Sequence, residues 1–220
     1  MTTTFSIPKG LRVTALVAHP DDEAVGCGGL LARLAREGAV CRAVLVFHRT
    51  DSRVGDLWPV LVDAFKASCA ELGSEAVVAA SLPESGPGLD TQRLHDALID
   101  EVVGSDLVLT HWGGDTHQAH RALERAVEIA TRPFRRHCHL WQFETPTSSD
   151  QGLHQSFSPN LCVALSREDV EAQRRAFARY PDSEHAPGRT TGDILDHARY
   201  RGRQYGLEFA SPVVATRMYV

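Results

Sequence analysis

A cluster of one imidazole and three carboxylates follows the first apolar stretch of the chain. The stretch Val13–His19 runs into the cluster His19-Pro20-Asp21-Asp22-Glu23, and the glycine-rich apolar segment Ala24–Leu34 follows. This order predicts a buried strand, a tight turn and the start of a helix. Holding three carboxylates at one turn costs several kcal/mol unless something compensates their charge. A divalent metal is the simplest compensation, since His and Asp are among its ligands.

Strand-like and helix-like segments alternate from Leu11 to Phe143. Their apolar patterns predict strands at 11–18, 40–47, 76–80, 106–110 and 138–143, and helices at 22–37, 58–72, 91–103 and 116–131. Such repeated units predict an α/β fold with a mostly parallel sheet and helices on both faces. After Glu144 the pattern changes to a polar loop over 145–158, a strand at 161–165 and helices at 167–180 and 192–205. We interpret this part as a C-terminal loop and helix subregion.

Three polar clusters fall where predicted strands end, at 19–23, 48–51 and 111–120. Open α/β sheets bind ligands beyond the carboxyl ends of their strands, so these clusters are expected to share one site. The third cluster contains His111, His117 and His120. Because His117 and His120 are three residues apart, they lie near one face of the predicted helix.

Two motifs resemble the PIG-L/LmbE family of zinc-dependent N-deacetylases. One is Ala18-His19-Pro20-Asp21-Asp22-Glu23 with Gly26-Cys27-Gly28-Gly29 behind it, and the other is Asp115-Thr116-His117-Gln118-Ala119-His120, similar to the family's D-x-H-x-D-H. Weaker matches are Leu72-Gly73, Ser158-Pro159-Asn160 and Glu208-Phe209. The resemblance covers most of the chain and implies a Rossmann-like sheet in a single domain over residues 1–220.

The resemblance also implies roles for five residues. The zinc ligands would be His19, Asp22 and His120. Asp21 would be the general base that takes a proton from zinc-bound water, and His117 would stabilise the oxyanion and protonate the leaving amine. These roles are chemically sound, because two nitrogens and one carboxylate leave zinc an open position for water. Fe²⁺ and Co²⁺ suit a similar ligand set.

Simpler interpretations exist for single residues of the first motif. Asp21 or Asp22 alone would suit the cap of the following helix. Glu23 suits either a hydrogen bond to a ligand imidazole or the first helical turn, where its charge matches the dipole. For His111 we expect a structural role, because an imidazole at the end of a buried strand can bond to backbone.

The chain departs from the family at positions that affect substrate recognition. Ala119 stands where the second motif usually has Asp, and Asp115 is a partial substitute. His48-Arg49-Thr50-Asp51 replaces the frequent T-x-G-E, and the next helix has Leu61 and Ala64 instead of the Arg-x-x-Glu pair. We predict substrate contacts at Arg49, Asp51, Trp112 and Asp115, and a covering role for the Ser/Thr-rich loop after Glu144.

The predicted reaction is zinc-dependent hydrolysis of the N-acetyl group of an N-acetylglucosamine-type conjugate. One alternative is another N-acyl or peptide-like amide, and a second is a non-catalytic metal- or sugar-binding homologue. A nucleotide-binding protein is disfavoured, because the first turn carries carboxylates where a phosphate needs glycine amides.

Composition narrows the partners to a small molecule. The net charge of −5 over 220 residues argues against nucleic acid. The sequence has neither a membrane-length apolar run nor a secretion signal at its start, so we expect no membrane contact and a cytoplasmic location. Five cysteines without close spacing suggest reduced, mostly buried thiols. The oligomeric state is open, a homo-oligomer included.

Overall fold

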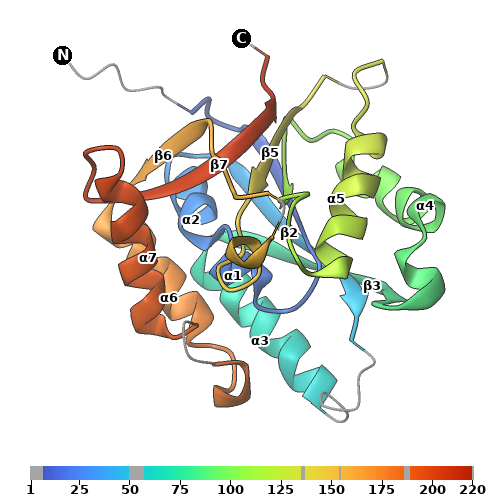
Figure 1. Cartoon of the computed structure of the whole chain (residues 1–220), viewed down its shortest axis with the longest axis horizontal. Coiled ribbons are helices and arrows are strands. Elements are labelled where there is room, and N and C mark those ends of the chain that lie inside the picture. The colour runs from blue at the N-terminus through green and yellow to red at the C-terminus, as the bar shows by residue number, and fades with distance from the viewer. Residues whose placement is uncertain (1–6, 50–56, 135–136, 154, 186–188, 220) are drawn as a thin grey trace.

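The computed structural model describes residues 7–49, 57–134, 137–153, 155–185 and 189–219. Within these residues one sheet has the strands β1 (Arg12–Val17), β2 (Val40–His48), β3 (Ser74–Pro83), β4 (Leu107–His111), β5 (His139–Phe143), β6 (Leu161–Leu165) and β7 (Phe209–Arg217). The α-helices are α1 (Asp22–Val25), α2 (Gly28–Arg36), α3 (Trp58–Glu71), α4 (Thr91–Val102), α5 (Gln118–Ala130), α6 (Arg167–Phe177) and α7 (Thr191–Arg203). Figure 1 shows their arrangement.

The strand order is β3-β2-β1-β4-β5-β7-β6. The first five strands in this order are parallel, and β7 lies antiparallel between β5 and β6. The chain moves outward from β1 to β3 and then returns to β4 on the other side of β1. The strand order therefore reverses between β1 and β4, which is where open α/β sheets form a ligand crevice.

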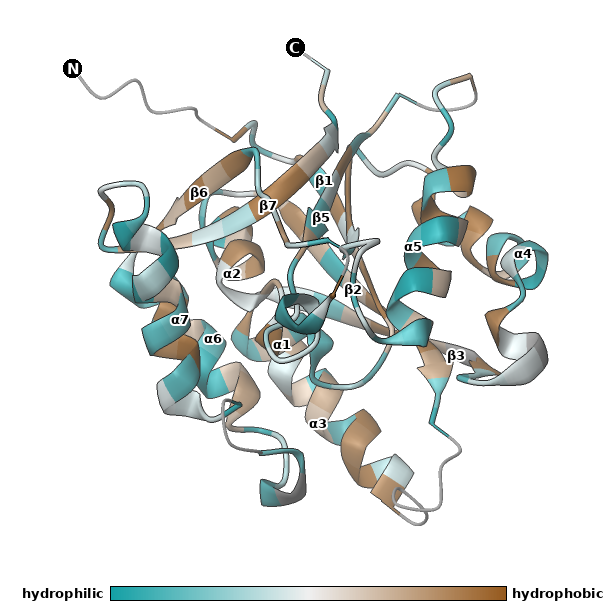
Figure 2. Cartoon of the chain, in the orientation of Figure 1, coloured by the Kyte–Doolittle hydropathy of each residue, from teal (hydrophilic) through white to brown (hydrophobic). Residues whose placement is uncertain are grey.

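Helices cover both faces of the sheet, as the sequence predicted. Ala15 and Val17 of β1 belong to a core shared with α2, α3 and α6, whereas Leu16 and Ala18 belong to a core shared with α4 and α5. This division follows from the alternation of side chains along a strand. Figure 2 shows apolar strands between helices whose polar residues face outward.

The helix predicted over 22–37 is two helices, α1 and α2, with a break at Gly26 and Cys27. A Cβ atom on Gly26 would lie 2.6 Å from the ring of Phe143 on β5. This close approach excludes a side chain at position 26. The contact comes from a strand far along the chain, so helical periodicity alone did not reveal it.

Strand β7 was not predicted. It contains Pro212, which is opposite Cys162 of β6. Proline lacks an N–H and is rare inside a sheet, so the sequence pattern argued against a strand there. Among the described helices, none has the length and apolar character to cross a membrane.

Candidate active site

The first motif occupies the turn between β1 and α1, at the reversal point of the strand order. His19 follows β1, Asp21 precedes α1, and Asp22 is the first residue of α1. The backbone N–H of His19 donates to Oδ2 of Asp22 at 2.8 Å. His120 lies in the first turn of α5, which follows β4. The fold thus brings both sequence motifs to one place.

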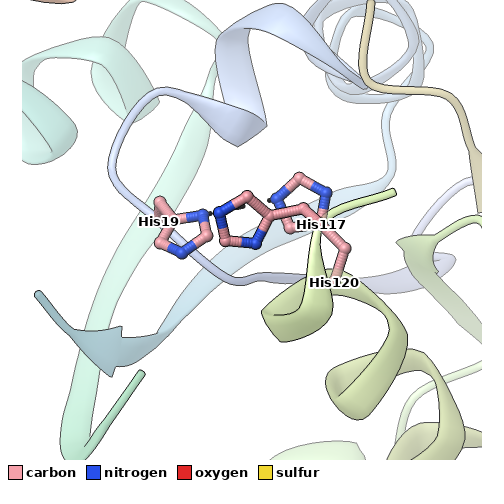
Figure 3. A group of neighbouring side chains, drawn as sticks. All are labelled: His19, His117 and His120. Carbon is pink, nitrogen blue, oxygen red and sulfur yellow. Dashed lines mark hydrogen bonds between the residues drawn. The ribbon is translucent and has the colours of Figure 1, made fainter. Parts of the chain in front are cut away.

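Three side-chain atoms form a nearly equilateral triangle. Nδ1 of His19 lies 3.2 Å from Oδ2 of Asp22, and Nε2 of His120 lies 3.4 Å from that oxygen and 3.3 Å from Nδ1 of His19. Figure 3 shows His19 facing His120, with His117 beside them. Tetrahedral zinc with bonds of ~2.0–2.2 Å needs ligand atoms about 3.3–3.5 Å apart. The donor set predicted from the sequence therefore fits a zinc ion.

Charges around the triangle also suit a cation. Burial alone would lower the pKa of His120, but the carboxylates of Asp22 and Asp115 raise it to about 9. Burial would raise the pKa of Asp22, but the charge of His120 holds it well below its usual range. The carboxylates thus stabilise positive charge between the imidazoles, where a divalent metal would replace protons.

A second carboxylate lies behind each of the two histidines. Oε2 of Glu84 lies 2.9 Å from Nε2 of His19, and Oδ2 of Asp115 lies 3.2 Å from Nδ1 of His120. Such partners orient metal-binding imidazoles and fix their tautomers. Glu84 was not predicted from the sequence. It directly follows β3, so its carboxylate lies at the sheet edge where β1 and β4 also end.

Asp115 is engaged by donors of the chain itself. It is 1% exposed and accepts hydrogen bonds from the backbone N–H of His117 (2.7 Å) and from the hydroxyls of Ser148 (2.8 Å) and Ser149 (2.7 Å). These bonds and His120 lower its pKa to about 2, although burial alone would raise it. Asp115 thus contacts His120 and donors of this chain, and its predicted contact with substrate stays a prediction.

His111 is buried beside the triangle in a structural arrangement. Its Nε2 accepts the backbone N–H of Ala18 at 3.1 Å, and its Nδ1 lies 3.1 Å from Oγ1 of Thr145. Its ring stacks on that of His120, with centroids 3.8 Å apart. Burial and His120 lower its pKa to about 4, so the imidazole is neutral. Because the Ala18 N–H occupies the Nε2 lone pair, His111 is a poor ligand despite its position.

Asp21 has a strained backbone and a cationic partner. Its φ is 102°, in the left-handed region that disfavours residues other than glycine. Its side chain does not cap α1; instead it accepts a hydrogen bond of 2.5 Å from Nη2 of Arg189. Burial raises the pKa of Asp21 to about 7, against the opposing charge of Arg189. Arg189 was not predicted as a partner of Asp21, because the two residues lie 168 positions apart in the sequence.

His117 sits at the mouth of the site and is exposed. Its Nδ1 accepts the backbone N–H of Ala119 at 3.3 Å, which leaves the ring proton on Nε2. Although His117 reaches solvent, the walls of the site partly desolvate it, and this partial burial and the charges of His19 and His120 lower its pKa to about 4. The imidazole of His117 is therefore a neutral N–H donor at neutral pH.

Within the described residues, the carboxyl of Glu23 bonds to hydroxyls and to the backbone N–H of Asp21. It is fully buried and accepts hydrogen bonds from the hydroxyls of Ser68 (2.5 Å) and Tyr180 (2.6 Å). Burial raises its pKa to about 8. Glu23 thus lies in the first turn of α1, as one of its two interpretations expected, and its contacts join α1 to α3 and to the segment after α6.

The triangle opens into a cavity of about 180 Å³, called the metal cavity below. Its wall includes His19, Asp21, Asp22, Arg49, Glu84, His117, His120, Thr145, Thr147, Ser148, Glu184 and Arg189. Arg49, for which a substrate contact was predicted, lines this cavity, and Nη1 of its side chain donates to Glu184 at 3.2 Å. The loop after Glu144 also contributes, as expected. Trp112 is 4% exposed and packs against Phe157 outside this wall, and Asp51 lies outside the described residues.

Comparisons with known proteins agree with this geometry. Residues 14–131 match the PIG-L family model, described as GlcNAc-PI de-N-acetylase. The chain is 28% identical over 185 residues to the uncharacterized deacetylase YaiS of Escherichia coli strain K12, covering 80% of this chain and 93% of YaiS.

Two solved structures share the fold. The A40926 pseudoaglycone deacetylase Dbv21 has a TM-score of 0.73 at 15% identity, covering 96% of this chain and 100% of Dbv21. GalB, the 4-carboxy-2-hydroxymuconate hydratase of Pseudomonas putida KT2440, has a TM-score of 0.69 at 16% identity, covering 95% of this chain and 97% of GalB. The fold therefore accommodates more than one reaction, and the site must decide between them.

Proposed function

The chain belongs to the PIG-L family, and from this premise we propose that it is a metal-dependent deacetylase of an N-acetylglucosamine-type conjugate. The reaction releases acetate and a free amine. The observation that carries the proposal is the triangle of His19, Asp22 and His120 with the carboxylate of Asp21 in the same cavity. We further propose that the chain is one domain acting in the cytoplasm on a small-molecule substrate.

The resident metal is proposed to be zinc, held by Nδ1 of His19, Oδ2 of Asp22 and Nε2 of His120. When bound, such a metal polarises the acetyl carbonyl and lowers the pKa of water in its open position. Fe²⁺ and Co²⁺ suit the same donors. Glu84 and Asp115 orient the two imidazoles from behind.

Asp21 is the proposed general base. A pKa of about 7 suits a base at neutral pH, since it is both deprotonated in a useful fraction and basic enough to take a proton. Arg189 holds one of its carboxylate oxygens. The other oxygen would accept the proton of the attacking water.

His117 is the proposed oxyanion donor. Its Nε2–H, the proton that remains when Nδ1 accepts the Ala119 N–H, would donate to the carbonyl oxygen as charge develops there. The leaving amine requires a proton, which Asp21 can return after accepting it from water.

The experiment is acetate release from N-acetylglucosamine conjugates by chelator-treated and zinc-reloaded protein. Asp21→Asn should retain zinc and lose about 10²–10⁴-fold in kcat, because it removes only the base. Asp22→Ala should lose zinc itself, measured by metal analysis. Full activity of Asp21→Asn would contradict the role of Asp21. Absence of release by zinc-loaded wild type would favour another amide substrate or a non-catalytic binder.

A further inference from the structure

The backbone of Asp21 has a conformation that a residue with a side chain does not favour. Its φ of 102° lies in the left-handed region, and its side chain provides no cap for α1. Such conformations persist where surrounding contacts enforce them, and they concentrate at active sites. The contacts that enforce this conformation therefore decide where the carboxylate of the proposed base points.

Both backbone groups of Asp21 are hydrogen-bonded. Its carbonyl oxygen accepts the N–H of Ala24 at 3.0 Å and the N–H of Val25 at 2.8 Å, as expected at the start of a helix. Its own N–H donates to a side chain instead, with 3.2 Å between the nitrogen and Oε2 of Glu23. The carboxyl of Glu23 thus fixes the peptide that precedes the Cα atom of Asp21.

Two hydroxyl groups from distant parts of the chain hold the carboxyl of Glu23. Its Oε1 accepts the hydroxyl of Ser68 on α3 at 2.5 Å and the hydroxyl of Tyr180, which follows α6, at 2.6 Å. Glu23 and Ser68 are 0% exposed and Tyr180 is 3% exposed, so water does not compete for these bonds. Helices α3 and α6 pack against each other and both contact α1, so the two hydroxyls tie the turn to that pair of helices (Figure 1).

Glu23, Ser68 and Tyr180 are absent from the described wall of the metal cavity. They therefore contact neither substrate nor metal there. Their common link to the site is the N–H of Asp21, which belongs to the strained residue itself.

We propose that Ser68 and Tyr180 are positioning residues for Asp21 and act through Glu23. The two hydroxyls fix the carboxyl of Glu23, and this carboxyl fixes the backbone of Asp21 so that its side chain points into the metal cavity. Arg189 holds the side chain of Asp21 from the cavity wall. This inference rests on the proposed function, because it requires Asp21 to be the base.

The first test needs neither metal nor turnover. Hydrogen exchange followed by NMR on metal-free protein reports how firmly the N–H of Asp21 is held. Its exchange rate should rise at least tenfold in the double variant Ser68→Ala/Tyr180→Phe. The rate at Leu16, within β1, should stay at the wild-type value.

Two matched variants control for the loss of a hydroxyl as such. Ser74→Ala removes a buried hydroxyl without a hydrogen-bond partner in the described part of the chain, and Tyr200→Phe removes a hydroxyl that accepts from Gln204. Both should exchange as wild type does. An unchanged rate at Asp21 in the double variant would overturn the inference. An equal rise at Leu16 would also overturn it, since the hydroxyls would then stabilise the whole fold.

The second test is acetate release by zinc-loaded protein. In the double variant Ser68→Ala/Tyr180→Phe, kcat should fall about 10²-fold, as expected for a reacting group displaced by about 1 Å. KM and zinc affinity should stay at the wild-type values, a separation that a merely structural defect would not produce. An unchanged kcat, or a loss of zinc affinity as large as the loss of kcat, would overturn the positioning role.

A double-mutant cycle tests the path through Glu23. Glu23→Leu removes the acceptor and should itself lower kcat, and in that background Ser68→Ala/Tyr180→Phe should cause no further loss. A further loss as large as that in wild type would overturn the role of Glu23 as the link. Absence of turnover by wild-type protein would contradict the proposed function, and the exchange rates would still decide whether the hydroxyls hold Asp21.

Discussion

The metal cavity has two walls of different construction. The sheet wall consists of His19, Asp22 and His120, which come from the ends of β1 and β4 and are 8%, 2% and 3% exposed. The loop wall consists of Arg49, Glu184 and Arg189, which come from connecting segments and are each partly exposed. Side chains of the sheet wall are fixed by several buried contacts, whereas those of the loop wall meet in ion pairs between distant segments.

The difference in construction indicates different roles: the sheet wall suits metal binding, and the loop wall suits substrate selection. The fold places the donor atoms of the sheet wall at ligand spacing, and buried contacts hold them there for metal binding. Ion pairs of the loop wall can exchange a partner for a substrate oxygen at small cost, since such pairs contribute little to stability. We expect changes in the sheet wall to alter metal affinity and changes in the loop wall to alter substrate choice.

The largest effect in this comparison is expected from the carboxylates behind the sheet wall. Glu84→Gln and Asp115→Asn should each weaken zinc binding about 10–100-fold, because each removes the charge that orients a ligand imidazole. Chelator competition on the purified variants measures this directly. Asp96→Asn, which changes an exposed carboxylate on α4, is the control with unchanged affinity.

Zinc affinity that stays at the wild-type value in both variants would contradict the positioning role. A loss in Asp115→Asn alone has a further explanation, because Asp115 also anchors Ser148 and Ser149. Melting of the metal-free variants separates the two explanations, since a folding defect would appear without zinc.

The sheet wall could be predicted from the sequence because its chemistry is local. His19, Asp21 and Asp22 are neighbours, and a strand that ends in such a cluster is placed by its apolar pattern alone. His120 required only the rule that parallel strands end at one edge. The parallel part of the sheet could also be predicted, because the alternation of strands and helices is a local pattern in the sequence.

The loop wall could not be predicted in the same way. Arg189, two residues before α7, contacts Asp21 in the turn after β1. No periodic pattern in the sequence predicts a contact between such distant residues. Glu84 was visible as a carboxylate after β3, but its proximity to His19 depends on the register of the strands between them. Strand β7 was not predicted, because it contains Pro212 and proline is rare inside a sheet.

A smaller effect concerns the loop between β4 and α5, which carries Asp115. Glu124 accepts a hydrogen bond from Nε2 of Gln142 at 2.7 Å beneath Gly113, and burial raises its pKa to about 7. As pH rises from about 4.5 to 7, the unfolded chain releases this proton before the folded chain does, so stability declines. Glu124→Gln should remove that decline, by on the order of 1 kcal/mol after solvent screening of a partly exposed group.

Urea unfolding of metal-free protein at pH 4.5 and pH 7.5 tests this expectation. The variant should lose less stability than wild type between the two pH values. Glu75→Gln, at an exposed position of β3, should behave as wild type. An equal loss in Glu124→Gln and wild type would mean that Glu124 titrates at its ordinary value in the fold.

The smallest effect is expected in the loop wall, at the pair of Arg49 and Glu184. Their side chains are only 18% and 15% exposed and lie 3.2 Å apart, so a double-mutant cycle of Arg49→Ala and Glu184→Gln should give a coupling in stability on the order of 1 kcal/mol, at or above that of a fully exposed pair. Both single variants should leave zinc affinity unchanged and alter KM more than kcat, because they modify binding away from the reacting atoms. A tenfold loss of zinc affinity in either variant would mean that the pair also supports metal binding, and it would contradict the division of roles between the two walls. An effect confined to KM would support the division of roles, since residues in the same cavity as the metal ligands would then govern only which substrate binds.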